Sequence, residues 1–351
     1  MVKTNKKKYL FFINQDYSFA VLRPLQDEIL KRGDEVKWFL YGEEIHYKYL
    51  KKDEKRVFDV KEITDFNPDA VFVPGNVVPS FISGLKVKVF HGLPSGKRTR
   101  KGREYHYDIK GMFDFYCTKG PKSTAKFKEL SKEYGSFLVQ ETGWCKLDPL
   151  FLGDESKSSP KQKTIFFAST FSPRFSRAKI LYPLIHSMMK KYDFYWYVTL
   201  HPKMDKDVVE LYKSIDLDNV KFVETTEVID AFKDADLMVC DTSSIMYEFL
   251  TQLKPVITFQ TEKDEPHLIN VEDIDKLEQT ILSVLESPCI NRDNIENSVK
   301  QFHPYRDGKS STRVLDSVEK MLEEGVVLKK KPFNLVRNFK LRKELNYWKI
   351  I

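Results

Sequence analysis

The chain has 351 residues, of which 41% are hydrophobic and 13% aromatic, and 58 basic and 51 acidic side chains give it a formal net charge of +7. This length exceeds the size at which one core usually keeps growing, so we expect two domains. The modest, dispersed charge and the absence of zinc-finger or RNP-type patterns argue against a nucleic-acid partner. No apolar run reaches the roughly 20 residues of a membrane-spanning helix, and Met1 to Lys8 lead into a strand without a cleavable signal. We therefore expect a cytoplasmic protein.

The first half of the sequence alternates short apolar runs with helical patterns, which is typical of a parallel α/β sheet. The expected elements are strand Tyr9–Ile13, helix Phe19–Lys31, strand Val36–Tyr41, a charged helical stretch Glu43–Lys52, strands Ala70–Val73 and Val87–Phe90, helix Lys122–Tyr134 and strand Phe137–Val139. Residues 153–162 carry no apolar side chain, which predicts a linker.

The same alternation restarts after this linker. The expected elements are strand Thr164–Ala168, helix Arg177–Lys191, strand Phe194–Leu200, helix Asp207–Ile215, strands Val220–Val223 and Leu237–Cys240, a helix from Ile245, strand Val256–Phe259, and helices Val271–Glu286 and Lys309–Glu324. Two such runs predict two doubly wound, Rossmann-like α/β domains with a cleft between them, at residues 1–152 and 163–328, followed by a basic tail at 329–351. Ligands of such sheets bind beyond the carboxyl ends of the strands.

Three polar segments directly follow predicted strands, namely His91-Gly92-Leu93-Pro94, His201-Pro202 and Asp241-Thr242-Ser243-Ser244. A histidine at a strand end can act as a general base near neutral pH. A hydroxyl-rich turn that opens a helix favours phosphate, because free backbone N–H groups and the helix dipole attract anions. Each segment also fits a structural role, as a histidine bonded into a turn or as an ordinary helix cap.

Two further segments combine cations with glycine or hydroxyl groups. The run from Lys97 to Arg103 fits either a solvated loop or a loop that folds over phosphates. The segment from Asp307 to Arg313 fits a capped helix start, in which Arg313 could also bind a phosphate bidentately. A Walker A loop, a GxGxxG fingerprint and metal-ligand cysteine spacing are all missing from the sequence, so we expect no metal and no obligatory cofactor.

Taken in order, these motifs resemble those of the CDP-glycerol:poly(glycerophosphate) glycerophosphotransferase family, the polymerases and primases of teichoic-acid-like polymers. The correspondences are His91-Gly92-Leu93-Pro94 with the family's His-Gly-Thr-Pro, Gly143 to Leu150 with Gly-x-Pro-Arg-x-Asp-x-Leu, His201-Pro202 with His-Pro, Asp241-Thr242-Ser243-Ser244 with Asp-Tyr-Ser-Ser, and Asp307-Gly308 and Arg313 with Asp-Gly…Arg. The chain departs from the family pattern at Leu93, Cys145, Lys146 and Thr242, which leaves the donor and the acceptor open.

The resemblance implies a GT-B-type fold with an acceptor-side N-terminal domain and a C-terminal domain for the donor, CDP-glycerol or a related CDP-alditol. It implies that His91 removes the acceptor hydroxyl proton and that His201 binds or polarises the donor pyrophosphate. Donor phosphates would be held by Thr242, Ser243, Ser244, Asp307, Ser311 and Arg313. The acceptor or its phosphates would contact Lys97, Arg98, Arg100 and Arg103. The expected acceptor is a capsule, teichoic-acid-like or other cell-envelope polymer, or a lipid-linked acceptor. The reaction would add glycerol phosphate or a related alditol phosphate to it and release CMP.

Two other functions fit the same sequence. One is a GT-B glycosyltransferase or UDP-sugar 2-epimerase that uses a UDP-sugar, and the other is a non-catalytic module that binds nucleotides or polyanions. The basic tail at 329–351 also has two interpretations. It could form a helix that lies on an anionic membrane surface, which would make the protein peripheral on the inner face of the cell membrane, or it could pack back on the fold.

Overall fold

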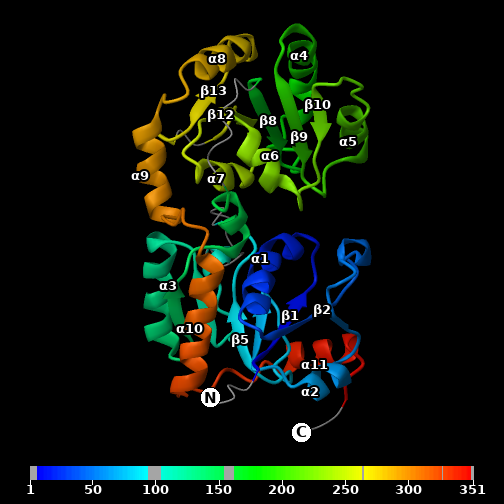
Figure 1. Ribbon diagram of the computed structural model, residues 1–351, viewed down its shortest axis with the longest axis vertical. Coiled ribbons are helices and arrows are strands. Elements are labelled where there is room, and N and C mark those ends of the chain that lie inside the picture. Colours follow the sequence, from blue (N-terminus) through cyan, green and yellow to red (C-terminus); the bar gives the residue numbers. More distant parts are fainter. Residues whose placement is uncertain (1–5, 94–103, 154–161, 263–264, 326, 349–351) are drawn as a thin grey trace. The chain divides into compact units, whose positions relative to one another are not determined.

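The computed structural model describes residues 6–93, 104–153, 162–262, 265–325 and 327–348. It divides into two compact units, of which unit 1 comprises Met1–Asp148 and Asp307–Ile351, and unit 2 comprises Pro149–Arg306. Each unit is built on one parallel sheet accompanied by helices (Figure 1). Most of the predicted linker, residues 154–161, lies outside the described residues. Within the part of the chain that the structure describes, no helix is long and apolar enough to cross a bilayer.

Unit 1 contains a seven-stranded parallel sheet in the order β3-β2-β1-β4-β5-β6-β7. Its strands are β1 (Lys8–Ile13), β2 (Glu35–Leu40), β3 (Arg56–Val57), β4 (Ala70–Val73), β5 (Leu85–Lys88), β6 (Phe115–Thr118) and β7 (Leu138–Glu141). Its helices are α1 (Tyr17–Lys31), α2 (Val60–Phe66), α3 (Pro121–Tyr134), α10 (Ser310–Glu324) and α11 (Leu335–Glu344). The central strands are apolar on both faces because both faces of the sheet are covered.

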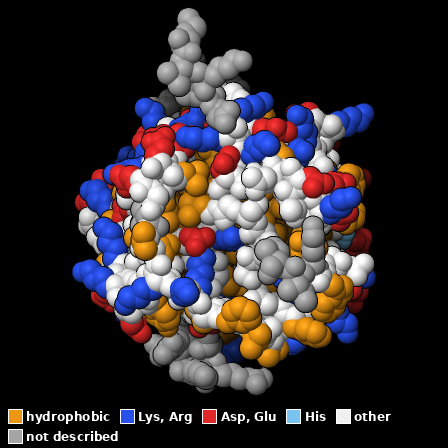
Figure 2. Space-filling model, turned by 90° about the horizontal axis from the view of Figure 1, so that it is seen from below, with side chains coloured by type: hydrophobic (Ala, Val, Ile, Leu, Met, Phe, Trp, Pro, Cys, Tyr) orange, Lys and Arg blue, Asp and Glu red, His pale blue; other side chains and the backbone are white. Residues whose placement is uncertain are grey.

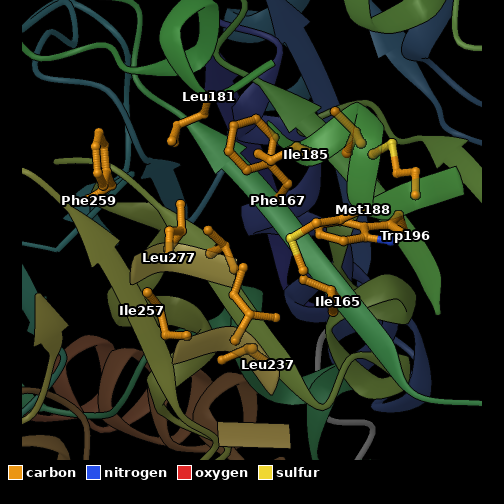
Figure 3. Close-up of a cluster of buried hydrophobic side chains, with 14 of the residues drawn as sticks. Ile165, Phe167, Leu181, Ile185, Met188, Trp196, Leu237, Ile257, Phe259 and Leu277 are labelled. Carbon is orange, nitrogen blue, oxygen red and sulfur yellow. The ribbon is translucent and has the colours of Figure 1, made fainter. Parts of the chain in front are cut away.

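Unit 2 contains a six-stranded parallel sheet in the order β10-β9-β8-β11-β12-β13. Its strands are β8 (Thr164–Ser169), β9 (Tyr195–Leu200), β10 (Val220–Phe222), β11 (Leu237–Cys240), β12 (Val256–Phe259) and β13 (Ile269–Val271). Its helices are α4 (Ala178–Lys191), α5 (Lys206–Lys213), α6 (Val228–Asp234), α7 (Ile245–Leu250), α8 (Ile274–Glu286) and α9 (Arg292–Phe302). Figure 3 shows the core in which Ile185 and Met188 of α4 meet Phe167 and Trp196 of the sheet.

Two parallel sheets flanked by helices confirm the predicted α/β class with two Rossmann-like units. The charged stretch Glu43–Lys52 was expected to be helical, but it contains only a single 3-10 turn at Tyr47–Tyr49. Contacts with α1 and the residue before it hold this stretch in place, because Asp16 accepts from the His46 backbone N–H at 2.8 Å and the Arg23 guanidinium donates to the Tyr49 carbonyl. Tertiary contacts therefore override the local helical pattern.

The second domain was expected to run to residue 328, but unit 2 ends at Arg306 and α10 belongs to unit 1. Helix α10 packs beside α1, where the Arg32 guanidinium pairs with Asp316 at 2.7 Å and with Glu319 at 3.2 Å. The tail also belongs to unit 1, and Leu341 of α11 is buried in the core of that unit. Part of the tail therefore packs back on the fold.

Candidate functional site

His91 lies just beyond β5, after Phe90 has left the strand with a left-handed φ of 58°. Its Nδ1 is 3.2 Å from the carbonyl oxygen of Pro74, which follows the neighbouring strand β4. A carbonyl can only accept a hydrogen bond, so Nδ1 carries the proton and Nε2 is the basic nitrogen. The imidazole also packs on the Tyr17 ring, with centroids 5.1 Å apart. This hydrogen bond gives His91 the tautomer that a general base needs.

Lys88 holds the backbone segment on which His91 depends. Its buried ammonium group donates to the carbonyl oxygen of Pro74 at 2.8 Å, to that of Gly75, and to Asn76 Oδ1 at 2.9 Å. Burial lowers the pKa of Lys88 well below its ordinary value. The Pro74 carbonyl thus accepts hydrogen bonds from both Lys88 and His91. Lys88 therefore helps to hold the carbonyl that positions the His91 imidazole.

A second buried lysine lies beside the same histidine. The Lys119 ammonium group donates to the Gly92 carbonyl and lies 4.0 Å from the centroid of a Trp144 ring. Desolvation, followed by the charges of Lys88 and Lys119, lowers the pKa of His91 to about 4, and the hydrogen bond to Pro74 opposes this shift. The His91 side chain is exposed, so solvent screens part of the effect of these charges. His91 is neutral at pH 7.

The His106 imidazole stacks on the ring of Phe90, the residue before His91, with centroids 5.0 Å apart. His106 therefore lies close to the same segment of the chain. Desolvation, followed by the charges of Lys119 and Lys88, lowers its pKa to about 2. His106 was not among the predicted site residues, because it does not directly follow a predicted strand. Cationic and neutral nitrogen groups therefore gather around His91, and this arrangement favours an anionic group nearby.

His201 follows β9 in unit 2 and has the opposite hydrogen-bond arrangement. Its Nδ1 accepts from the Lys203 backbone N–H at 3.0 Å, so the proton of the neutral ring is on Nε2. The ring packs on Phe171 with centroids 4.3 Å apart, and the His201 backbone N–H donates to the Ser169 carbonyl at 3.2 Å. An Nε2–H group at the carboxyl end of a strand is a donor suited to a phosphate oxygen.

Asp241 joins three elements at the carboxyl edge of the unit 2 sheet. Its buried carboxylate accepts from the Ser169 hydroxyl, from the Thr170 backbone N–H at 2.8 Å and from the Arg177 backbone N–H at 3.0 Å. Burial raises the pKa of Asp241 to about 6, although these hydrogen bonds favour the ionised form. Asp241 was not among the predicted site residues. A carboxylate directly after a fully buried strand was the signal that could have identified it as the residue that fixes this turn.

Three hydroxyl residues, Thr242, Ser243 and Ser244, follow Asp241 and lead into α7. Ser244 occupies the residue before α7, but its side chain makes no capping hydrogen bond. Thr242 and Ser244 are exposed and Ser243 is half-buried. The ordinary-cap interpretation of this turn is therefore wrong for Ser244, and its hydroxyl group remains at the surface of unit 2.

The predicted phosphate residues of the closing motif lie in unit 1, with His91, and not in the unit that contains His201 and Ser243. The Asp148 carboxylate accepts from the backbone N–H groups of Ser310 and Ser311 at 2.8 and 2.6 Å, so a protein carboxylate occupies the start of α10. Burial raises the pKa of Asp148, and the hydrogen bonds from Ser311 and Ser310 oppose that shift.

Arg313 completes this junction. Its guanidinium donates to both carboxylate oxygens of Asp307, at 2.8 and 3.1 Å, and to the Thr142 carbonyl at 2.8 Å. This bidentate pair lowers the pKa of Asp307. The structure thus brings Asp307, Ser311 and Arg313 together as a junction between α10 and the rest of unit 1.

The remaining predicted site residues, Lys97, Arg98, Arg100 and Arg103, lie outside the described residues. Among the residues that are described, no group of three or more His, Cys, Asp or Glu side chains is arranged to hold a metal ion.

Comparisons with known proteins point to the same family. A sequence model of the CDP-Glycerol:Poly(glycerophosphate) glycerophosphotransferase family matches residues 184–267. The teichoic acid glycerol-phosphate primase of Bacillus subtilis (strain 168) is 22% identical over an alignment of 262 positions, and the match covers 68% of this chain and 66% of that protein. The resemblance to the family is confirmed, and the match spans somewhat less than two thirds of the primase.

Solved structures show the same fold. The wall teichoic acid polymerase TagF superposes with a TM-score of 0.65 at 13% identity, over 91% of this chain and 89% of that one. A putative UDP-N-acetylglucosamine 2-epimerase from Listeria monocytogenes superposes with a TM-score of 0.63 at 15% identity, over 93% of this chain and 99% of that one. These likenesses confirm the predicted GT-B-type fold.

Proposed function

We propose that this chain, a relative of the CDP-glycerol:poly(glycerophosphate) glycerophosphotransferases, transfers glycerol phosphate or a related alditol phosphate from a CDP-activated donor to a hydroxyl group of a polymeric or lipid-linked acceptor. The observation that carries the proposal is the pair of opposite tautomers. His91 has its basic nitrogen at Nε2, whereas His201 has its proton there. A phosphoryl transfer needs both a proton acceptor and a donor for the leaving group.

In the proposed reaction, the acceptor hydroxyl oxygen attacks the β-phosphorus of the donor, and its proton passes to His91 Nε2. The bond from that phosphorus to the bridging oxygen breaks, and CMP leaves with the bond's electron pair. Hydrogen bonds from the His201 Nε2–H and from the hydroxyl groups of Ser243 and Ser244 would offset the negative charge that develops on CMP. The scheme balances without a cofactor or a metal ion.

We divide the predicted phosphate residues between two roles, binding of the donor and support of α10. We keep Thr242, Ser243 and Ser244 as donor-phosphate residues because their hydroxyl groups lie at the end of β11 and Ser244 does not cap α7. We assign Asp307 and Arg313 to the α10 junction, because the Arg313 guanidinium donates both to the Asp307 carboxylate and to the Thr142 carbonyl. A cytoplasmic location remains a prediction.

The test is a donor panel with purified full-length protein. CDP-glycerol, CDP-ribitol and UDP-N-acetylglucosamine are supplied separately with a short glycerol-phosphate acceptor, and released nucleotide is quantified. We expect CMP from a CDP-alditol, and its release at least about 100-fold more slowly from the His91→Ala variant.

One rival function is favoured by a specific observation, the fold likeness to a UDP-N-acetylglucosamine 2-epimerase. Turnover of the UDP-sugar alone, with no CMP from either CDP-alditol, would establish the rival and overturn the proposal. Nucleotide binding without any turnover, unchanged by loss of His91 and His201, would instead indicate a binding module.

A further inference from the structure

Helix α11 and its flanks expose large apolar side chains. Phe333 is 75% exposed and Trp348 is 50% exposed, and Leu335, Val336 and Phe339 fall between these values. The rings of Phe339 and Trp348 are in contact, with centroids 5.5 Å apart. Five bulky apolar residues within 16 positions thus form an apolar group on the outside of unit 1. We call this group, together with the neighbouring lysines, the α11 surface.

The opposite face of α11 is anchored to unit 1 mainly by polar contacts. Asn334 Nδ2 and Arg337 Nη1 both donate to the Lys110 carbonyl at 3.1 Å, and Ser80 Oγ donates to Asn338 Oδ1 at 3.0 Å. Leu341 is the one residue of α11 that is buried. Helices on soluble domains normally bury the apolar face and expose the polar one. Helix α11 departs from this arrangement, because it exposes Leu335, Val336 and Phe339 beside its lysines.

The charge around this apolar group is strongly positive. The segment from 329 to 344 contains seven basic residues and a single acidic one, Glu344; the basic residues are Lys329, Lys330, Lys331, Arg337, Lys340, Arg342 and Lys343. Lys331 pairs with Asp114, whereas Lys330, Lys340 and Lys343 are exposed. Figure 2 shows the face of the molecule seen from below, toward which α11 lies in Figure 1, with apolar side chains bordered by Lys and Arg side chains.

We propose that the α11 surface docks onto an anionic lipid bilayer. The five apolar side chains would enter the boundary between headgroups and acyl chains, and Lys330, Lys340 and Lys343 would bind headgroup phosphates. A second copy of this chain is a poorer occupant, because a symmetric contact would place two basic segments against each other. This inference goes beyond the proposed function and does not depend on catalytic turnover.

The contact would also place unit 1 at the membrane. The Lys110 carbonyl that holds α11 belongs to a residue that lines a small cavity with Lys88 and His106, in the same unit as His91. If the transferase proposal is correct, a lipid-linked acceptor would reach the unit that carries the general base.

The experiment is flotation of the full-length protein with vesicles of phosphatidylcholine alone and of phosphatidylcholine mixed with phosphatidylglycerol. We expect the protein to float with the anionic vesicles and to be released by high salt. The Val336→Ser/Phe339→Ser variant should lower the partition coefficient at least about tenfold, because it removes two inserted apolar side chains. The Lys340→Gln/Lys343→Gln variant should lose the preference for anionic vesicles.

Ile180→Ser is the matched control, because Ile180 is a similarly exposed apolar residue (54%) that belongs to α4 of unit 2. It should float like the parent protein, and equal thermal melting of all variants verifies folding. Equal partitioning of the parent and the Val336→Ser/Phe339→Ser variant overturns the proposal. So does a concentration-dependent dimer in sedimentation experiments that this variant abolishes, since the occupant would then be a second copy. Neither outcome involves CMP release, so failure here is distinct from failure of the transferase proposal.

Discussion

His91 Nδ1 lies 3.2 Å from the carbonyl oxygen of Pro74, and this relationship fixes where the histidine carries its proton. In unit 2 the Lys203 backbone N–H donates to His201 Nδ1 at 3.0 Å, which fixes the other tautomer. Backbone groups, which do not titrate, hold both assignments. The two histidines are thereby suited to opposite tasks, one to take up a proton and the other to donate a hydrogen bond.

Replacing His91 tests the first task. In His91→Asn the side-chain amide can still donate to the Pro74 carbonyl, but no basic nitrogen replaces Nε2. We expect the rate of CMP release to fall by about 10²–10⁴-fold, which is the usual contribution of a general base, with little change in donor affinity. Rapid-mixing kinetics and calorimetric donor binding measure the two quantities. A variant that turns over within a few-fold of the parent would remove His91 from the mechanism.

Replacing Lys119 tests the electrostatics of the same site. His91 acts as a base only above its pKa, and nearby positive charge holds that pKa below its ordinary value. Lys119→Met removes part of this charge, so the pKa of His91 should rise and the acidic limb of the kcat/KM profile should move to higher pH.

Lys122→Met is the control for this experiment, because Lys122 is exposed near the start of α3. Its pH profile should match that of the parent, and the imidazole titration of His91 can be followed independently by NMR. An acidic limb that moves to lower pH in Lys119→Met contradicts the assignment.

Replacing Asp148 tests the role of the α10 junction. Asp148→Ala leaves the buried backbone N–H groups of Ser310 and Ser311 without their acceptor, so we expect the free energy of unfolding to fall by about 3 kcal/mol. Donor affinity of the folded variant should stay the same. Asp316→Ala, which breaks a largely exposed pair with Arg32, should cost no more than about 1 kcal/mol. Urea titrations give both values, and a loss of donor affinity in Asp148→Ala would return this helix start to the phosphate site.

Asp241 should make the stability of unit 2 depend on pH. Its pKa is about 6 in the folded protein and near 3.8 when unfolded, so its favourable contribution is full below pH 3.8 and declines as the pH rises to about 6. Two pKa units correspond to about 3 kcal/mol. Asp241→Asn lacks this titration, so its stability deficit relative to the parent should be smaller at pH 7 than at pH 4. A deficit that is larger at pH 7 would contradict the raised pKa.

The sequence located the buried strands well because their apolar runs are continuous. The predicted bounds of β4, β11 and β12 match the structure. The two-residue strand β3 and the helices α2, α6 and α9 were not expected, and three of these four elements are no longer than seven residues. The assignment of α10 to unit 1 rests on contacts between Asp148 and Ser310 and between Arg32 and Asp316, which sequence order does not encode.

In the candidate site, too, some features could be predicted from the sequence and others depend on tertiary contacts. His91 and His201 could be found because each directly follows an apolar strand. The tautomer of His91 could not, because Pro74 lies 17 residues away and only the pairing of β4 with β5 brings it near. The network of Asp241 likewise depends on Thr170 and Arg177, which reach it only when β8 and α4 are in place.

The most direct test of the transferase account is the mass of the acceptor after incubation with CDP-glycerol. We predict that a defined acceptor gains whole glycerol-phosphate units, with one CMP released for each unit added, and that the His91→Asn variant adds them at least about 100-fold more slowly. An acceptor that never gains mass while CMP accumulates, or that gains a sugar only when a UDP-sugar is supplied, would contradict it.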